Sequence, residues 1–171
     1  MNHNEVLSER FLMKILTEDL VTETYLSWFK QESGLDHIEY SKNKNITLGS
    51  LKQYASEKFN SSECLFFGIY DRKENKHIGN IKFEPINFQQ GYTVLGVLIG
   101  AAKWRGQGVF TEIFKVLSIE LKKLGLKKVY LGVSNDNKAA IAAYEKAGFS
   151  LDVKNESKTD QSKGFSMVAS L

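Results

Sequence analysis

One stretch constrains the fold more than any other: residues 104–111, WRGQGVFT, join an apolar run to a long amphipathic segment. The run before it, Val94–Gly100, is short, continuous and rich in β-branched residues, which predicts a buried strand. After it, apolar residues recur at helical spacing from Phe110 to Leu124, which predicts a helix. The first backbone N–H groups of a helix have no intrahelical partner, and the helix dipole favours negative charge there. The stretch therefore predicts an anion site between strand and helix.

The composition of the loop narrows the kind of anion site. Gly106 and Gly108 lack a Cβ atom, so a diphosphate can approach the main chain closely, and Arg105 adds a positive charge at the mouth. The loop has no Gly-Lys-Ser/Thr, so it is not the P-loop of nucleoside triphosphate binding. Thr111 stands where the dinucleotide fingerprint needs its third glycine, and no acidic residue ends the next strand. A nicotinamide site is therefore disfavoured.

The composition excludes several classes of protein. A chain of 171 residues with 42% hydrophobic and 25% charged residues suits one soluble domain, spanning residues 1–171. No apolar run approaches the roughly 20 residues of a membrane span, and the first ten residues lack the apolar centre of a signal peptide. We therefore expect a cytoplasmic protein with no membrane partner. A net charge of +3, evenly spread, argues against nucleic-acid binding.

The cysteine and histidine content predicts no metal site. Cys64 is the only cysteine, so an internal disulfide is impossible, and it opens an apolar run typical of a buried strand. The three histidines do not cluster with it in the sequence, which gives no support to a zinc site.

The pattern along the chain alternates strands and helices. Strands are expected at Arg10–Leu16, Leu65–Asp71, His77–Glu84, Val94–Gly100, Lys127–Val133, Phe149–Val153 and Gly164–Ala169. Helices are expected after Thr17, after Thr47, over Phe110–Leu124 and over Lys138–Lys146. Pro85 should end the third of these strands. The expected fold is α/β (α+β), with a mixed, mostly antiparallel sheet of about seven strands and about four helices.

A second group of polar residues follows the strand Lys127–Val133. Asn137 and Tyr144 are seven residues apart, two helical turns, so they project from the same face of their helix. A right-handed crossover places this strand beside Val94–Gly100, which brings the N-termini of the two helices to the same end of the sheet. One site would then hold an anion on the glycine loop, an amide and a phenol.

At this point the residues resemble a known family. The phrase RGQGV, followed by NDNKAAIAAYEKAGF at residues 135–149, is similar in order and spacing to the two cofactor motifs of GNAT-type N-acetyltransferases. The first strand and the segment around Trp28 resemble the ribosomal-protein-acetyltransferase-like branch. Within that branch, YLSWF and HIGNIKFEPIN resemble acetyltransferases that act on amino sugars of nucleotide-sugar pathways.

The resemblance implies a site for acetyl-CoA, used as a co-substrate. It implies that the central strands splay apart and that the strand ending in Leu98, Ile99 and Gly100 pairs with the pantetheine arm. It further implies that Asn137 and the adjoining Lys138 contact the cofactor, and that Tyr144 protonates the departing thiolate. The backbone amides that would hold the pyrophosphate are those of Arg105, Gly106, Gln107, Gly108, Val109 and Phe110.

The sequence departs from the family pattern in two places. Phe110 stands where the motif usually has glycine or alanine, so its ring is expected to narrow the loop. There is no Asp or Glu from Pro85 to Thr111, so the strand before the loop lacks the carboxylate that many relatives carry. An alkylammonium with a pKa of about 10 must lose a proton before it attacks a thioester. Glu84 is the leading candidate for the base, with His37 and Asp36 behind it.

The sequence thus predicts an acetyl-CoA-dependent N-acetyltransferase whose acceptor is a primary amine on a small molecule, such as an amino-sugar nucleotide. Two alternatives within the family stay open: a protein N-terminal acetyltransferase of the ribosomal-protein type, and a non-catalytic acyl-CoA-binding module. A third is a phosphate-binding oxidoreductase of another fold. The resemblance is also compatible with a homodimer.

Overall fold

A computed structural model describes residues 5–30, 45–154 and 164–171 of the chain. Its centre is an eight-stranded sheet in the order β1-β2-β3-β4-β5-β6-β8-β7. The strands are β1 (Glu5–Leu7), β2 (Phe11–Ile15), β3 (Leu65–Asp71), β4 (His77–Asn87), β5 (Tyr92–Ile99), β6 (Lys128–Ser134), β7 (Ser150–Leu151) and β8 (Gly164–Ser170). The α-helices are α1 (Glu23–Lys30), α2 (Leu48–Phe59), α3 (Val109–Lys123) and α4 (Lys138–Lys146).

The pairing of the strands confirms the predicted fold class. Every neighbouring pair in the sheet is antiparallel except β5 and β6, which are parallel. The described residues contain four α-helices, as predicted, but eight strands in place of about seven. The additional strand is β1, whose three residues pair with β2. Three residues are too few to show a period of two, so the sequence pattern gives no signal for it.

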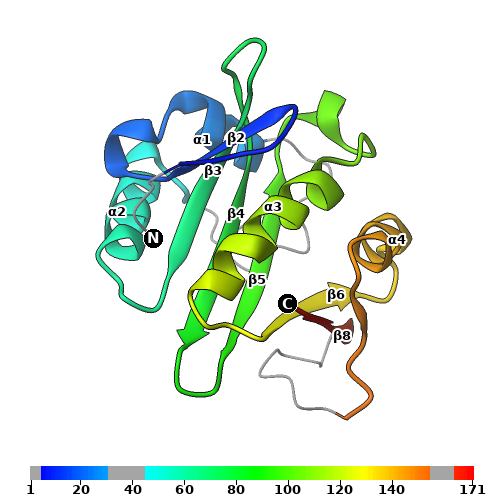
Figure 1. Cartoon of the computed structure of the whole chain (residues 1–171). Helices are drawn as coiled ribbons and strands as arrows, with labels where there is room; N and C mark the ends of the chain where they lie inside the picture. Colours follow the sequence, from blue (N-terminus) through cyan, green and yellow to red (C-terminus); the bar gives the residue numbers. More distant parts are fainter. Residues whose placement is uncertain (1–4, 31–44, 155–163) are drawn as a thin grey trace.

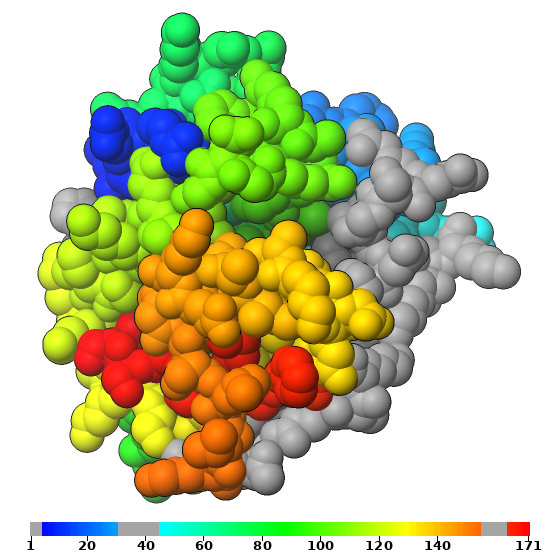
Figure 2. Space-filling model, turned by 90° about the vertical axis from the view of Figure 1, so that its right-hand side faces the viewer, coloured from blue at the N-terminus to red at the C-terminus, as the bar shows by residue number. Residues whose placement is uncertain are grey.

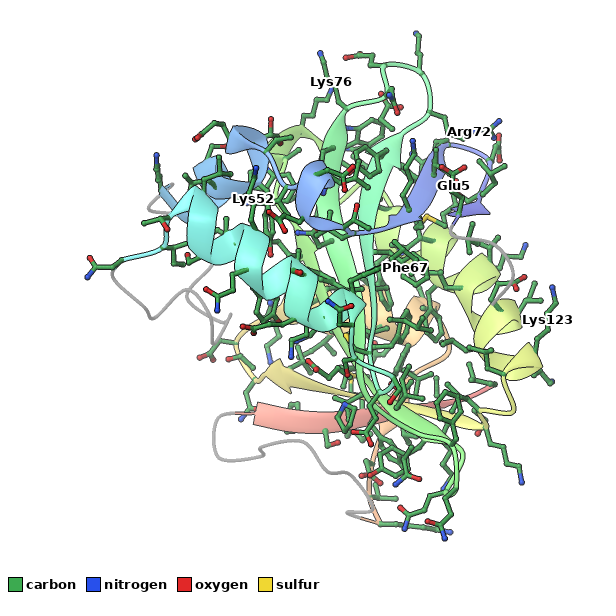
Figure 3. The ribbon with its side chains drawn as sticks, turned by 90° about the vertical axis from the view of Figure 1, so that its left-hand side faces the viewer. Glu5, Lys52, Phe67, Arg72, Lys76 and Lys123 are labelled. Carbon is green, nitrogen blue, oxygen red and sulfur yellow. The ribbon has the colours of Figure 1, made fainter. Side chains whose placement is uncertain are left out.

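The helices cover both faces of the sheet (Figures 1 and 3). α3 and α4 pack over one face, where the larger apolar cluster includes Ile113, Leu117 and the fully buried Phe67. α1 and α2 pack over the opposite face, in a smaller cluster that includes Trp28 and Leu51. We call these two sides the α3 face and the α2 face. On β5, Leu95 belongs to the α3 face and Leu98 to the α2 face, because successive side chains of a strand alternate.

The helix predicted after Thr47 begins there, whereas the one predicted after Thr17 begins later, at Glu23, and Thr17 makes no side-chain cap bond. Thr47 is the N-cap of α2: its hydroxyl oxygen accepts the Ser50 amide at 3.1 Å, and the Ser50 hydroxyl accepts the Thr47 amide at 3.0 Å. This reciprocal pair is a capping box built with a serine at the third position. After α3, Gly125 has a φ of +84°, the left-handed conformation that ends many helices.

The prediction that Pro85 ends its strand is wrong. β4 continues to Asn87, because an extra residue on β4 accommodates the proline. Phe83 pairs with Leu95 and Ile86 with Thr93, so three steps along β4 match two along β5. Such a bulge leaves one residue outside the hydrogen-bonded ladder, where a residue without an N–H is tolerated.

The central strands β5 and β6 pair for three residues and then part. Tyr92–Val94 pairs with Lys128–Tyr130, and no later residue of β5 pairs with β6. Beyond Val94, no strand among the described residues pairs with that edge of β5, whereas β6 continues to Ser134 alongside β8. Figure 1 shows β6 turning away from β5. We call the resulting gap the β5–β6 opening; it confirms the splayed strands that the resemblance implied.

The described residues show neither a membrane-spanning helix nor a cluster of metal ligands. No helix in residues 5–30, 45–154 or 164–171 is long and apolar enough to cross a membrane. In the same residues, no group of three or more His, Cys, Asp or Glu side chains is placed to hold a metal ion.

Candidate functional site

The glycine loop between β5 and α3 adopts a conformation that requires glycine. Gly106 and Gly108 have φ angles of +72° and +71°, in the left-handed region where a Cβ atom is strained. Both glycines and Gln107 between them are exposed, so the main chain of the loop is open to a ligand. Gly108 is the residue before α3 and offers no side chain to cap the helix.

The first turn of α3 presents free backbone amides beside this loop. The first intrahelical hydrogen bond runs from the Glu112 amide to the Gly108 carbonyl at 3.1 Å. The amides of Val109, Phe110 and Thr111 precede that bond, so they are donors at the positive end of a 15-residue helix. The loop and these amides lie where the sequence predicts an anion site, and that site stays a prediction.

Arg105 has a different place from the one expected. Its Nε donates to the carbonyl oxygen of Ile99 at 3.0 Å, and its Nη2 donates to that of Gly100 at 3.2 Å. The guanidinium group therefore links the carbonyl end of β5 to the loop, and two of its five N–H groups are engaged in these bonds.

An ion pair between Arg10 and Glu112 links the turn between β1 and β2 to the glycine loop and the start of α3. Arg10, in the turn between β1 and β2, donates from Nε to Glu112 at 2.7 Å and from Nη2 to the Gln107 carbonyl at 3.0 Å. The Glu112 carboxylate also accepts the Arg10 amide and the Ser8 hydroxyl, each at 2.7 Å. Sequence reasoning missed this cluster, since Arg10 and Glu112 are about a hundred positions apart and no motif joins them.

The Glu112 cluster predicts a pH dependence of stability. Burial by itself raises the pKa of Glu112, but hydrogen bonds from Arg10 and Ser8 outweigh it and hold the pKa below its ordinary value of 4.5. A depressed carboxylate stabilises the fold above its unfolded-state pKa, and that stability is lost as the pH falls through the folded-state pKa. We expect Glu112→Gln to be less stable than the wild type at pH 7, with the difference shrinking below about pH 4.5.

Urea unfolding between pH 7 and pH 3 measures this effect. The control is Glu120→Gln in the last turn of the same helix, where the carboxylate pairs with the largely exposed Lys123; such pairs contribute little. If the Glu112→Gln and wild-type stabilities ran parallel at all pH values, the cluster would not be a source of pH dependence.

Phe110 and Tyr144 are in direct contact, so the structure brings the two predicted motifs together. Their rings meet edge to face with centroids 4.9 Å apart. Phe110 is buried and also stacks on Phe114, with Phe149 beside both. The Phe110 ring therefore packs inward beneath Tyr144, and the expected narrowing of the loop does not occur.

The environment of Tyr144 keeps its hydroxyl group protonated. The side chain is half-buried on α4, and burial raises the pKa of its phenol to about 12. At neutral pH the phenol therefore carries a proton that it can donate. Transfer of this proton to a thiolate, whose conjugate acid has a pKa of about 8.5, is uphill, because the pKa of the phenol is higher than that of the thiol.

Asn137 begins α4 on the far side of the opening. Its side-chain oxygen accepts the Ala140 amide at 3.1 Å, so it is the N-cap of the helix, a role that the sequence reasoning did not assign. Its amide nitrogen is the part that can donate to a ligand, and Lys138 is exposed beside it. Figure 2 shows the surface hollowed between the lobe that carries the glycine loop (green) and the lobe of α4 (orange).

Glu84 lies on the α2 face, against Lys58 of α2, whereas Tyr144 packs with the cluster of the α3 face. By its register on β4 it is beside Val94, where β5 and β6 are still paired, whereas Ile99 is five residues or roughly 16 Å further along the strand. Its carboxylate pairs with Lys58 at 2.6 Å and with Lys82 at 2.7 Å. Burial raises the pKa of Glu84, but these two hydrogen bonds outweigh it and lower the pKa below 4.5. The other two base candidates, His37 and Asp36, lie outside the described residues.

Trp28 covers the end of β5. A Cβ atom added to Gly100 would lie 2.0 Å from the indole, so the absence of a side chain at Gly100 lets the ring pack directly on the main chain. Trp28 is itself fixed by ring contacts with Tyr25 at 5.4 Å and with His77 at 4.9 Å. Trp28 is buried in the core, and its indole packs against the main chain at Gly100.

Comparison with known sequences matches the chain to one family. The model of the acetyltransferase (GNAT) family matches residues 19–149. Among curated proteins, an uncharacterized N-acetyltransferase, YobR, of Bacillus subtilis (strain 168) is 32% identical over 85 residues. That alignment covers 50% of this chain and 32% of YobR, so the chain spans about a third of the length of the curated relative it matches.

Comparison with solved structures matches the fold over nearly the whole chain. A spermidine N-acetyltransferase chimera from Vibrio cholerae SpeG and hSSAT is 18% identical with a TM-score of 0.74, covering 95% of this chain and 96% of that one. A putative ribosomal-protein-serine acetyltransferase from Vibrio cholerae is 16% identical with a TM-score of 0.72, covering 98% and 96%. The aminoglycoside acetyltransferase AAC(6')-Ib with coenzyme A and kanamycin is 18% identical with a TM-score of 0.72, covering 94% of each chain.

Proposed function

This chain belongs to the acetyltransferase (GNAT) family, and we propose that it transfers the acetyl group of acetyl-CoA to a primary amine on a small molecule. The observation that carries the proposal is the β5–β6 opening, which lies next to the free amides of α3. A thioester arm needs an unpaired strand edge to hold it, and its diphosphate needs donors at the end of that edge. This chain supplies both in one place.

The donor site uses main-chain atoms for most of its contacts. In the proposal, the amides of Gly106, Gly108, Val109 and Phe110 hold the pyrophosphate, because the loop is exposed and both glycines leave its backbone accessible. The amides of Arg105 and Gln107, which the resemblance also implied, donate instead to the carbonyl groups of Ala102 and Trp104. The unpaired edge of β5 up to Gly100 lies along the pantetheine arm. Asn137 and Lys138 contact the cofactor from the other side of the opening. Because the contacts are with the backbone, the Arg10–Glu112 pair contributes by holding the loop in shape.

The chemical step needs one proton to leave the amine and one to reach the sulfur. The amine nitrogen attacks the carbonyl carbon of the thioester, a C–N bond forms, and the C–S bond breaks. Tyr144 gives its phenolic proton to the departing sulfur, and solvent later returns a proton to the phenolate. Tyr144 holds its proton at neutral pH, and because burial raises its pKa to about 12 it is a weaker acid than a phenol in water.

The proton lost by the amine needs an acceptor of its own. Glu84 remains the predicted base, although its lowered pKa makes it a poor proton acceptor. An amine beside the ring oxygens of a sugar is less basic than an alkylamine, so water can take its proton more readily. This supports an amino sugar, in particular an amino-sugar nucleotide, as the acceptor.

A protein N-terminal amine is the second candidate for the acceptor. The fold likeness to a putative ribosomal-protein-serine acetyltransferase covers 98% of this chain, which keeps that branch open. A non-catalytic acyl-CoA-binding module is the third reading, since β5 carries no carboxylate. A homodimer and a cytoplasmic location stay predictions.

Two measurements test the proposal in sequence. Isothermal titration with acetyl-CoA should show one site per chain. Release of free thiol should then depend on an added amine, with a product heavier by one acetyl group in the mass spectrum. We expect transfer to amino-sugar nucleotides and none to N-terminal peptides. Binding without thiol release across both sets would favour the binding module, and no heat on titration would overturn the proposal.

A further inference from the structure

Two glycines mark the α2 face of the β5–β6 opening. Gly96 is the only exposed residue of β5, and Gly132 is the only exposed residue of β6. The last paired residues of the two strands are Val94 and Tyr130, and each glycine lies two residues beyond its own partner in that pair. The two glycines therefore occupy matching positions on either side of the opening, just past the point where the strands part. We call this pair of positions the glycine window.

The glycine window faces the side away from α3. Leu95 and Val97, on either side of Gly96, pack with the α3 cluster, and so do Leu131 and Val133, on either side of Gly132. Alternation along a strand then directs both glycines to the α2 face. A Cβ atom added to Gly96 would meet no heavy atom within 4 Å, so the space above it is open among the described residues.

A polar cluster with excess positive charge lies beside the window on the same face. Lys82 pairs with Gly96 across β4 and β5, which places their Cα atoms about 5 Å apart. The Lys82 ammonium group donates to the Tyr54 hydroxyl at 2.6 Å and to Glu84 at 2.7 Å. Lys58 donates to the other oxygen of Glu84 at 2.6 Å. Two ammonium groups thus share one carboxylate, which leaves one positive charge of this cluster without a counter-ion among the described residues.

The cluster is accessible and remains charged. The side chains of Lys58 and Lys82 are 22% and 27% exposed, and both ammonium groups lie within 5.3 Å of the Tyr54 ring centre. Burial by itself lowers the pKa of Lys82, but the hydrogen bonds to Glu84 and Tyr54 raise it above its ordinary value. The cluster therefore keeps its excess charge throughout the neutral range, which suits an anionic ligand and not a polycation.

We infer that the acceptor amine reaches the thioester through the glycine window, and that the Lys58–Lys82 pair binds an anionic group, a phosphate or a carboxylate, on the same acceptor. The inference rests on the proposed acetyl transfer and names the class of acceptor. Because neither glycine carries a side chain, an amine can pass between the strands from the α2 face while acetyl-CoA occupies the glycine loop.

The charge part is tested with two acceptors that differ by one phosphate, glucosamine 1-phosphate and glucosamine. The wild type should favour the phosphorylated sugar at least tenfold in kcat/KM, and Lys82→Met should abolish that preference. The control is Lys52→Met, which removes the same charge from another position of α2 (Figure 3) and should retain the preference. Equal kcat/KM values in the wild type, an unchanged preference in Lys82→Met, or transfer to spermidine alone would overturn the inference.

The window part is tested with Gly96→Ala and Gly96→Val. Because the space is open, the fold should tolerate both changes, and alanine in a strand loses less entropy on folding than glycine. We expect an unchanged Kd for acetyl-CoA and at least a tenfold loss of kcat/KM for the phosphorylated sugar, larger for valine. Unchanged kcat/KM in Gly96→Val would refute the window. Loss of acetyl-CoA binding by the wild type would instead refute the proposed function, so the two failures are distinguishable.

Discussion

Replacing Tyr144 by phenylalanine is expected to lower kcat by about 100-fold or more while changing the Kd of acetyl-CoA by less than about twofold, because a positioned proton donor contributes roughly 10²- to 10⁴-fold. The variant keeps the ring, and therefore the edge-to-face contact with Phe110 that joins α4 to the start of α3. Only the hydroxyl group is removed, so the thiolate must leave without a proton or take one from water. Steady-state thiol release and calorimetric titration measure the two quantities separately.

The matched control is Tyr70→Phe. Tyr70 is a second tyrosine whose pKa burial raises to about 12, but its hydroxyl group has no hydrogen-bond partner among the described residues. Its removal should leave both kcat and acetyl-CoA binding unchanged, since the ring contact with His77 remains. If Tyr144→Phe retained the wild-type kcat, the phenol would be a packing residue on α4 and water would protonate the sulfur. If it lost acetyl-CoA affinity instead, Tyr144 would belong to the binding contacts.

The parts of the site that the sequence predicted depend on local geometry. Gly106 and Gly108 occur where the backbone has positive φ angles, and Asn137 is the residue immediately before α4. Both features are set by neighbouring residues in the sequence, so a local pattern can indicate them. The parting of β5 and β6 was implied by the family resemblance, and the register confirms it. The fold class was predictable for the same reason, because most of its strands are long enough to show a clear hydrophobic period.

The parts that could not be predicted depend on contacts between distant segments. Arg10 reaches Glu112 and the loop only because the turn between β1 and β2 folds over the start of α3. Arg105 turns toward carbonyl groups of β5, which its charge alone does not indicate. The sequence places Glu84 at the end of a predicted strand, but β4 continues past it, and the Glu84 carboxylate is held by Lys58 and Lys82. A single sequence without pairing information contains no signal for such contacts.

Gly100→Ala is expected to destabilise the fold and to weaken acetyl-CoA binding together. The new Cβ atom would lie 2.0 Å from the indole of Trp28, which is 3% exposed and held between Tyr25 and His77, so the ring has no free space to move into. Overpacking of a core costs about 1–3 kcal/mol and sometimes more, and we expect about 3 kcal/mol here. For a domain of this size that lowers Tm by roughly 6–12 °C.

In Gly100→Ala the clash with Trp28 also displaces the Gly100 carbonyl, to which Arg105 donates a hydrogen bond. The end of β5 and the glycine loop then lose their fixed spacing. We expect the Kd of acetyl-CoA to rise by about tenfold or more, which corresponds to about 1.4 kcal/mol. The control is Gly96→Ala, the same substitution four residues earlier, where no atom lies within 4 Å and Tm should stay the same or rise slightly. Thermal unfolding and titration of both variants compare one chemical change in two settings. A wild-type Tm for Gly100→Ala would show that Trp28 can move aside, and the close contact would then have no part in shaping the donor site.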